Sequence, residues 1–416
     1  MGLPASGIIK ASDINLEAAR ATTANAPLGV QTGTAGAGSL VKIYETATPS
    51  PGVDQNSPYA YSDFYGKSYT PPTISCGTST AAIGQGVGIG YFEAELDFST
   101  TTGAIVIYFT AFGVPDGISF LYNGVTYNTL TSDYGGRITA AAGTNNIVGR
   151  NNASGCTESS LIANQPAGGY TLTKSVWNGT GFGSTGNTQS GLIAAATNIN
   201  LSVSDIIYTL VIPKTAASPS DGTLKIMAPC SGTAWRVTAP CAITLPSFTT
   251  NSVAASSTIA CCTATQNQTY YFARNATSIS SAPYTTFTID TNTLPKVNNF
   301  VYSNSTGATA LANGYYKINS TQALYVQNGV VDSIVTCPSC STDFQSSSNS
   351  NFGNVCSMSI SYTYSHNGSG TFPAAGDEVF DENDDPVISG YYKFNSTFVY
   401  KATLGTVDAG WPQNIC

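Results

Sequence analysis

The sequence predicts a mainly β protein with a short helical N-terminal anchor, a central β-sandwich or jelly-roll-like domain, and two repeated small C-terminal β modules. Three observations lead to this prediction. Short apolar stretches alternate with Gly, Pro and Asn turns over residues 71–245. Residues 12–22 form the one convincing helical pattern, and an eight-residue sequence recurs near the C-terminus.

The composition limits the classes of function. The chain has 416 residues, too many for one small core, and 42% are hydrophobic. Only 9% are charged, against roughly 25% in an ordinary globular protein, which suits extracellular β-structure and fibres. A net charge of −8 without a Lys/Arg cluster argues against nucleic-acid binding. No run reaches the ~20 apolar residues of a membrane helix, and no secretory signal is visible at Met1, so membrane insertion is not expected.

The first seventy residues read as an anchor and a linker. Ser12 can cap a helix over residues 12–22, and Asp13 suits the positive end of its dipole. A helix of about a dozen residues is marginal alone in water, so we expect it to dock on a partner. Residues 28–38 are rich in Gly, Thr and Ala, and Pro49, Pro51 and Pro58 stiffen the segment that follows.

The central domain is predicted over residues 71–245. Residues 104–112 are too apolar for a strand with one solvent-exposed face, so this strand should lie in the centre of a sheet. Residues 118–122 and 125–127 flank Asn123-Gly124, the strongest hairpin pattern in the chain. Residues 206–212 form another apolar strand that Pro213 closes. Trp235 and Trp411 are expected in cores.

An internal repeat defines the C-terminal part. The sequence GYYKINST at 314–321 recurs as GYYKFNST at 390–397. Upstream, Leu294-Pro295 and Val301-Tyr302 match Phe372-Pro373 and Val379-Phe380, and each copy ends near a cysteine, Cys337 or Cys416. We therefore predict two modules, at 246–345 and 346–416. Repetition of a small β unit is one way in which fibres and adhesins extend.

The leader carries a resemblance to a known class. Ile8-Ile9-Lys10-Ala11-Ser12-Asp13-Ile14-Asn15, followed by Ser62-Asp63-Phe64-Tyr65-Gly66-Lys67-Ser68, resembles a leader of many tail and fibre proteins of tailed bacteriophages. The resemblance covers residues 1–70 only. It implies a virion protein of the tail-fibre, head-fibre or tail-tip type, assembled in host cytoplasm and extracellular after release. The implied virion-anchor residues are Ser12, Asp13, Ile14, Leu16, Tyr61, Phe64, Tyr65 and Gly66. A disordered tail is the alternative.

The resemblance also implies partners and a role. The partners would be tail or capsid proteins, and a homotrimer is typical of such fibres. The β domains would face the host surface and bind a glycan or a protein there. One alternative is a tailspike polysaccharide depolymerase, which predicts a long parallel β-helix. Another is a bacterial surface adhesin or carbohydrate-binding module, which predicts an export signal. A lone His366 on an expected turn is a poor base for a Ser-His-Asp site, so no catalytic residue is predicted.

Two groups of polar residues could bind ligands. Asp116, Asn123 and Asp133 could hold Ca²⁺ or hydrogen-bond a glycan, because both need oxygen atoms on loops. Trp177 could stack on a sugar ring. Asp377, Asp381, Asn383 and Asp385 lie in a dense acidic segment that could hold Ca²⁺. Ordinary turn residues and a solvated hairpin tip are the competing interpretations. No other cofactor is expected.

Ten cysteines, an even number, predict disulfides in an oxidising setting. Cys337-Pro338-Ser339-Cys340 has the spacing of a redox dithiol but lacks the helix start that such a motif needs. A zinc site would need further ligands, with Cys261 and Cys262 the nearest candidates. Structural disulfides are the preferred interpretation, with connectivity left open, among Cys230, Cys241, Cys261, Cys262, Cys337, Cys340, Cys356 and Cys416.

Overall fold

The structure is a computed structural model, and the expected helix at residues 12–22 and the other leader residues lie outside the part that it describes. The described residues form two compact units. The first comprises the described residues up to Phe248 together with Tyr270–Leu311 and Asn328–Asp332, and the second comprises Thr249–Thr269, Ala312–Gln327 and Ser333–Cys416. The structure describes residues 72–76, 82–83, 88–133, 136–139, 146–151, 155–179, 181–192, 199–262, 267–280, 286–337, 342–367, 371–383 and 385–416.

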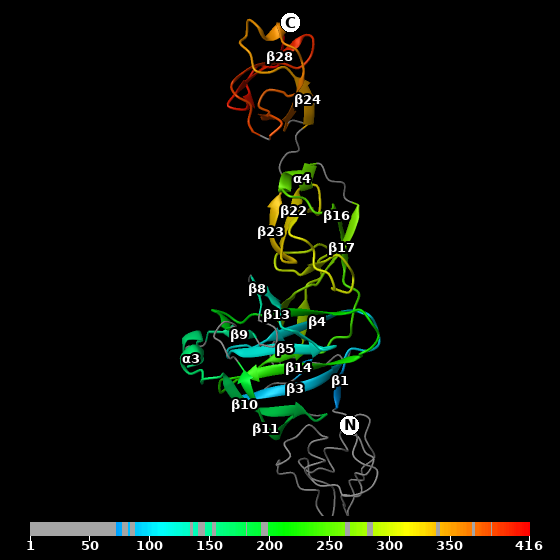
Figure 1. Ribbon diagram of the computed structural model, residues 1–416, viewed down its shortest axis with the longest axis vertical. Coiled ribbons are helices and arrows are strands. Elements are labelled where there is room, and N and C mark those ends of the chain that lie inside the picture. The colour runs from blue at the N-terminus through cyan, green and yellow to red at the C-terminus, as the bar shows by residue number, and fades with distance from the viewer. Residues whose placement is uncertain are drawn as a thin grey trace, which may run out of the picture. The chain divides into compact units, whose positions relative to one another are not determined.

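Two sheets form a β-sandwich in the first unit (Figure 1). In the larger sheet the order is β11-β10-β3-β14-β5-β9-β12, with β1 beside β3 and β6 beside β5. Its strands are β1 Thr73–Ser75, β3 Gly90–Asp97, β5 Asp116–Tyr122, β6 Val125–Tyr127, β9 Asn146–Arg150, β10 Tyr170–Trp177, β11 Phe182–Leu192, β12 Ile199–Ser202 and β14 Asp221–Ala228. The smaller sheet has the order β2 Ala82–Ile83, β15 Arg236–Thr238, β4 Gly103–Thr110, β13 Tyr208–Lys214, β7 Leu130–Ser132 and β8 Arg137–Ile138.

The main core lies between these sheets. Phe120 on β5 and Leu224 on β14 belong to the same buried cluster as Ile107 and Phe109 on β4 and Leu210 on β13. The fold class predicted from the sequence is therefore confirmed. The expected hairpin is also present, because β5 and β6 flank Asn123 and Gly124 with φ angles of 47° and 75°, the left-handed pair that a tight hairpin turn needs.

Strand β4 is apolar throughout because both of its faces are covered. All eight of its residues are buried. Ile105, Ile107 and Phe109 face the sandwich core, while Ala104, Val106 and Tyr108 belong to a second cluster with Phe287 and Phe300. Segment 270–311, which the sequence placed in the first module, thus packs on the outer face of the sandwich, within the first unit.

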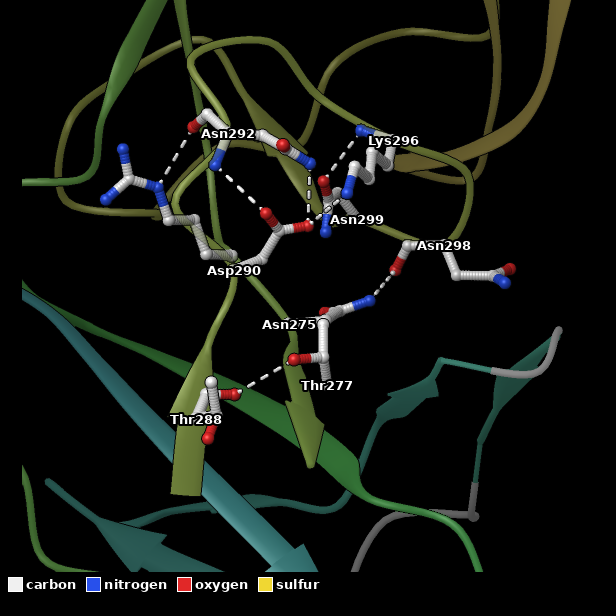
Figure 2. A network of polar contacts seen from close by, with 9 residues as sticks. Asn275, Thr277, Thr288, Asp290, Asn292, Lys296, Asn298 and Asn299 are labelled. Atoms are coloured by element: carbon white, nitrogen blue, oxygen red, sulfur yellow. Dashed lines mark hydrogen bonds and ion pairs between the residues drawn. The ribbon is translucent and has the colours of Figure 1, made fainter. Parts of the chain in front are cut away.

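A network of amides and charges holds this segment in place (Figure 2). Asp290 accepts hydrogen bonds from the backbone and side-chain amides of Asn292 at 2.9 and 2.7 Å and pairs with Lys296 at 2.8 Å. Buried Asn275 donates to the Asn298 carbonyl at 3.2 Å and accepts from Thr209 on β13 at 3.0 Å. These side-chain hydrogen bonds satisfy polar groups in a segment where short strands leave few backbone partners.

The remaining sheets follow the two copies of the repeat, although segment 270–311 of the first copy packs on the sandwich within the first unit. In the first module they are β16 Ser247–Thr250, β17 Gln268–Phe272 and β20 Val301–Tyr302; β18 Ala276–Ile279 and β19 Phe287–Ile289; and β21 Gly314–Lys317, β22 Gln322–Gln327 and β23 Val330–Thr336. In the second they are β24 Thr342–Ser346, β25 Tyr362–His366 and β26 Val379–Phe380; and β27 Gly390–Lys393, β28 Phe398–Thr403, β29 Thr406–Val407 and β30 Gln413–Asn414. The helices are α3 Glu158–Ala163, α4 Ser257–Cys262 and the 3₁₀ turn η3 Val355–Ser357. Within the described residues, no helix has the length and hydropathy to cross a membrane.

The two modules repeat one framework in detail. Tyr315 pairs with Tyr325 across β21 and β22, and Tyr391 pairs with Lys401 across β27 and β28, in the same register. The next tyrosine of each copy is buried. The Tyr316 hydroxyl donates to the Ala312 carbonyl at 2.9 Å, and that of Tyr392 to the Ile388 carbonyl at 2.7 Å.

Each copy is also closed by a disulfide in the same way. Cys261 is bonded to Cys337, and Cys356 to Cys416. In each copy, the lysine of the repeated sequence donates to the carbonyl of the first of these cysteines: Lys317 to Cys261, and Lys393 to Cys356 at 2.7 Å. The repeat therefore conserves a closed, cross-linked framework rather than a short peptide alone.

Candidate functional site

Three aromatic side chains of the second module gather at its surface. The ring centroids of Phe352 and Tyr391 are 5.2 Å apart, those of Tyr391 and Trp411 5.5 Å, and those of Phe352 and Trp411 6.3 Å, all in edge-to-face geometry. Phe352 is 53% exposed, and the other two are half-buried. We call Phe352, Tyr391 and Trp411 the aromatic cluster.

The fold explains why these rings meet. Tyr391 faces outward because the pleat of β27 turns Tyr392 into the core, where it is only 1% exposed. Phe352 lies in the turn that leads into η3. Trp411 lies in another turn, where its own backbone amide donates to the Asp408 carbonyl at 3.2 Å. The disulfide between Cys356 and Cys416 joins these two segments. The cluster is thus fixed by a strand and a cross-link.

An ion pair borders the aromatic cluster. Lys401, the cross-strand partner of Tyr391, places its Nζ 2.5 Å from Oδ2 of Asp408. The hydrogen bond with Asp408 raises the pKa of Lys401, and the same bond lowers the pKa of Asp408. Both groups are therefore charged at neutral pH and offer a donor and an acceptor beside the rings.

The described residues of the first module do not repeat this surface, so the aromatic cluster is not part of the framework that the two modules share. There Tyr315 stands at the position of Tyr391 and contacts Tyr325, with ring centroids 4.9 Å apart. Tyr325 occupies the register position of Lys401. The comparison within one chain separates residues that maintain the module from residues that are specific to the second copy.

Such a surface can bind a sugar. The C–H face of a pyranose packs against aromatic rings, and a carboxylate and an ammonium group hydrogen-bond its hydroxyls. Aromatic side chains held rigidly on β-structure also lose little conformational entropy when they bind.

The single histidine is enclosed rather than exposed. The expectation that His366 lies on a turn is wrong, because it is the last residue of β25 and is fully buried. Its Nδ1 lies 3.2 Å from Oδ2 of Asp377. In the first module, Phe272 pairs with Val301 as His366 pairs with Val379. His366 thus occupies the position of a core phenylalanine and contacts the half-buried Asp377, which indicates a structural role.

The oxygen-bearing residues predicted as a ligand site are not brought together. Asp116 is the first residue of β5, whereas Asn123 follows its last residue, so the strand separates them. Asp133 follows β7 in the other sheet. Trp177 ends β10 half-buried, with its ring edge against Phe182 at 5.5 Å.

Asp116 is buried, and this has a consequence for pH. Burial raises the pKa of this carboxyl well above its ordinary value, although Thr233 Oγ1 donates to it. The unfolded chain ionises near pH 4 while the folded one stays protonated, so this group's stabilisation is present below about pH 4 and is lost as the pH rises. We expect Asp116→Asn to stabilise the protein at pH 8 by more than about 1.4 kcal/mol relative to its effect at pH 4.

Thermal unfolding at pH 4 and pH 8 checks this expectation. Asp205→Asn, at an exposed position, is the matched control and should show no such difference. An equal effect of Asp116→Asn at both pH values would contradict the burial argument.

The acidic residues of segment 377–385 make separate hydrogen bonds, each with its own neighbours. Asp377 accepts from the Ala374 amide at 2.7 Å as well as contacting His366, and Glu378 accepts from Asn367 at 2.9 Å. Asp381 accepts from the amides of Asn383 and Asp385 at 2.9 and 3.1 Å. Among the described residues, no group of three or more His, Cys, Asp or Glu could hold a metal ion.

The structure pairs most of the predicted cysteines. In addition to the two module disulfides, Cys230 is bonded to Cys156 and Cys241 to Cys76. Cys340 lies outside the described residues, as do the predicted anchor residues of the leader.

Sequence reasoning missed the residues of the site, including the surface role of Trp411. Trp235 is fully buried as expected, whereas Trp411 is only half-buried: it packs against the core of the second module and also joins the aromatic cluster. Extending the comparison of the two copies beyond the octapeptide would have shown Lys401 in place of Tyr325. The sequence has no pattern that brings Phe352 to Trp411, since the disulfide pairing does so.

Comparison of the chain with protein-family models, with curated proteins and with solved structures finds no match. The described geometry and the sequence are therefore the basis of the functional argument.

Proposed function

We propose that this chain is a non-enzymatic display subunit of a tailed-bacteriophage virion, and that its second module binds a host-surface glycan. The observation that carries the binding part is the aromatic cluster with its ion pair, which the second copy of the framework has and the described part of the first copy does not. The virion part rests on the resemblance of the leader, with Ser12-Asp13-Ile14-Asn15 and Ser62-Asp63-Phe64-Tyr65-Gly66 as its two halves.

The build of the described residues supports display. Disulfides close both modules and cross-link the sandwich, which suits a protein that works outside the cell. A trimer, as the resembled fibres form, would present three copies of the second module. Weak single sites then gain from avidity.

The depolymerase alternative predicts a stacked parallel β-helix. Parallel pairing joins β1 and β10 to β3 and β12 to β9, whereas the central pairs of both sandwich sheets, such as β13 with β4 and β14 with β3 and β5, are antiparallel. This supports display over cleavage of polysaccharide. A bacterial adhesin could have the same glycan site. Association of the protein with virus particles distinguishes a virion subunit from an adhesin.

Trp411→Ala tests the binding surface directly. We expect the oxidised full-length protein to bind a defined subset of a glycan array, and the variant to lose at least tenfold in affinity, because removal of one stacking ring costs about 1.5 kcal/mol or more. Tyr362→Ala is the matched control, an aromatic 52% exposed in the same module but outside the cluster. Equal binding by the two variants, or no binding by the wild type, would contradict the proposal.

A further inference from the structure

A pocket lies in the sandwich domain and shares no residue with the aromatic cluster. It is a pocket of about 260 Å³ beside α3 and the disulfide between Cys156 and Cys230. This volume far exceeds the ~10–15 Å³ that one water needs. It lies just below the ~300 Å³ lower end of small-ligand pockets. It therefore suits a ligand of about one sugar ring.

The walls of this pocket are held by cross-links and caps. Cys156 precedes α3 and Cys230 follows β14, so their disulfide ties the two walls together. Thr157 caps α3 through a reciprocal pair of hydrogen bonds with Ser160, at 3.1 and 2.7 Å. The Tyr170 hydroxyl donates to the Leu161 carbonyl at 2.9 Å. The pocket is preorganised, which lowers the entropic cost of binding.

Among the lining residues that the structure describes, several are polar and none is charged. Its polar side chains are Asn164, Ser231, Ser160 and Tyr170. The Ser160 hydroxyl donates to local backbone carbonyls, and the Tyr170 hydroxyl donates to Leu161, which leaves the Tyr170 oxygen able to accept. Burial raises the pKa of Tyr170, so the phenol is neutral at physiological pH. Val114 and Pro229 add apolar surface.

This chemistry selects the ligand class. A charged ligand would lose hydration in the pocket without meeting an opposite charge. A neutral sugar offers hydroxyls for the amide and hydroxyl groups and C–H surface for the apolar side chains. The arrangement matches such a ligand better than it matches an ion.

We propose that the pocket bounded by α3 and the disulfide of Cys156 and Cys230 binds a neutral monosaccharide unit, independently of the aromatic cluster. Because the disulfide forms part of the lining and joins the walls, the site exists only in the oxidised protein. The inference stands apart from the proposed function and does not require virion attachment.

The test uses the oxidised full-length chain and saturation-transfer NMR with separate neutral hexoses and N-acetylhexosamines, with glucuronate as the charged comparison. We expect saturable binding of at least one neutral sugar and none of glucuronate. Ser231→Phe, which fills the pocket from its exposed rim, should weaken this binding more than tenfold. Asn164→Ala, which removes the amide and leaves the fold intact, should weaken it several-fold.

Matched variants separate this site from the aromatic cluster. Thr215→Phe, at an exposed position outside the lining, and Trp411→Ala should both retain the binding. Cys156→Ser with Cys230→Ser should lose it. Absence of saturable neutral-sugar binding, or binding that Ser231→Phe and Asn164→Ala leave unchanged, would overturn the proposal. Binding lost only in Trp411→Ala would overturn it as well and leave the proposed function standing.

Discussion

Replacing Cys356 and Cys416 together by serine is expected to destabilise the second module by about 4 kcal/mol. Their disulfide closes a separation of 60 residues, and loop-closure entropy for a loop of this size gives about that value. The module is small and its core holds few large side chains, among them Tyr392, Phe394 and Tyr400. A loss of this size is a large part of what such a core can supply.

Hydrogen exchange followed by mass spectrometry measures the effect by segment. Peptides covering β27 and β28 should exchange roughly a thousandfold faster in the double variant, while β4 and β13 of the sandwich keep their protection. The control is Cys261→Ser with Cys337→Ser, which should leave β27 and β28 protected. Unchanged exchange of β27 and β28 in the first variant would show that the disulfide is not what holds the module together.

Gly103→Ala is expected to destabilise the sandwich by about 3 kcal/mol. Gly103 begins β4 at a φ of 156°, and a Cβ there would lie 2.3 Å from the carbonyl oxygen of Ile243. This neighbour is backbone, held by the paired hydrogen bonds of 2.7 and 2.9 Å between Ala104 and Ile243. It cannot move aside as a flexible side chain would.

Chemical denaturation of the oxidised chain measures this loss, with tyrosine and tryptophan fluorescence as the signal. Gly113→Ala is the matched control, because nothing lies within 4 Å of a Cβ built there. It should stay within about 0.5 kcal/mol of the wild type. Equal stability of the two variants would mean that β4 and Ile243 do not approach as described.

Local patterns predicted much of the fold. Strand β4 and the hairpin of β5 and β6 follow from uninterrupted apolar residues and from Asn123-Gly124, which are properties of neighbouring residues. The repeat of GYYK at 314 and 390 identified β21 and β27 as equivalent elements, and their cross-strand partners agree in register. The apolar run and the hairpin turn each lie within about ten residues of sequence, and the repeat is found by comparing two short segments.

Long-range features were not predictable in this way. The packing of segment 270–311 on the outer face of β4 depends on apolar residues such as Phe287 and Phe300 that also suit a separate module core. Disulfide connectivity is a matter of three-dimensional proximity, and Cys76 pairs with Cys241 across 165 residues. The aromatic cluster depends on the disulfide between Cys356 and Cys416, which joins segments that are distant in sequence. No local sequence motif therefore contains its three members.

A cryo-EM map of intact virus particles tests the central claim most directly. The account predicts ordered density for residues 1–70 against a capsid or tail protein, with the second module and its aromatic cluster accessible from outside. Absence of the chain from particles, or a leader without contact to any virion protein, would contradict the display function.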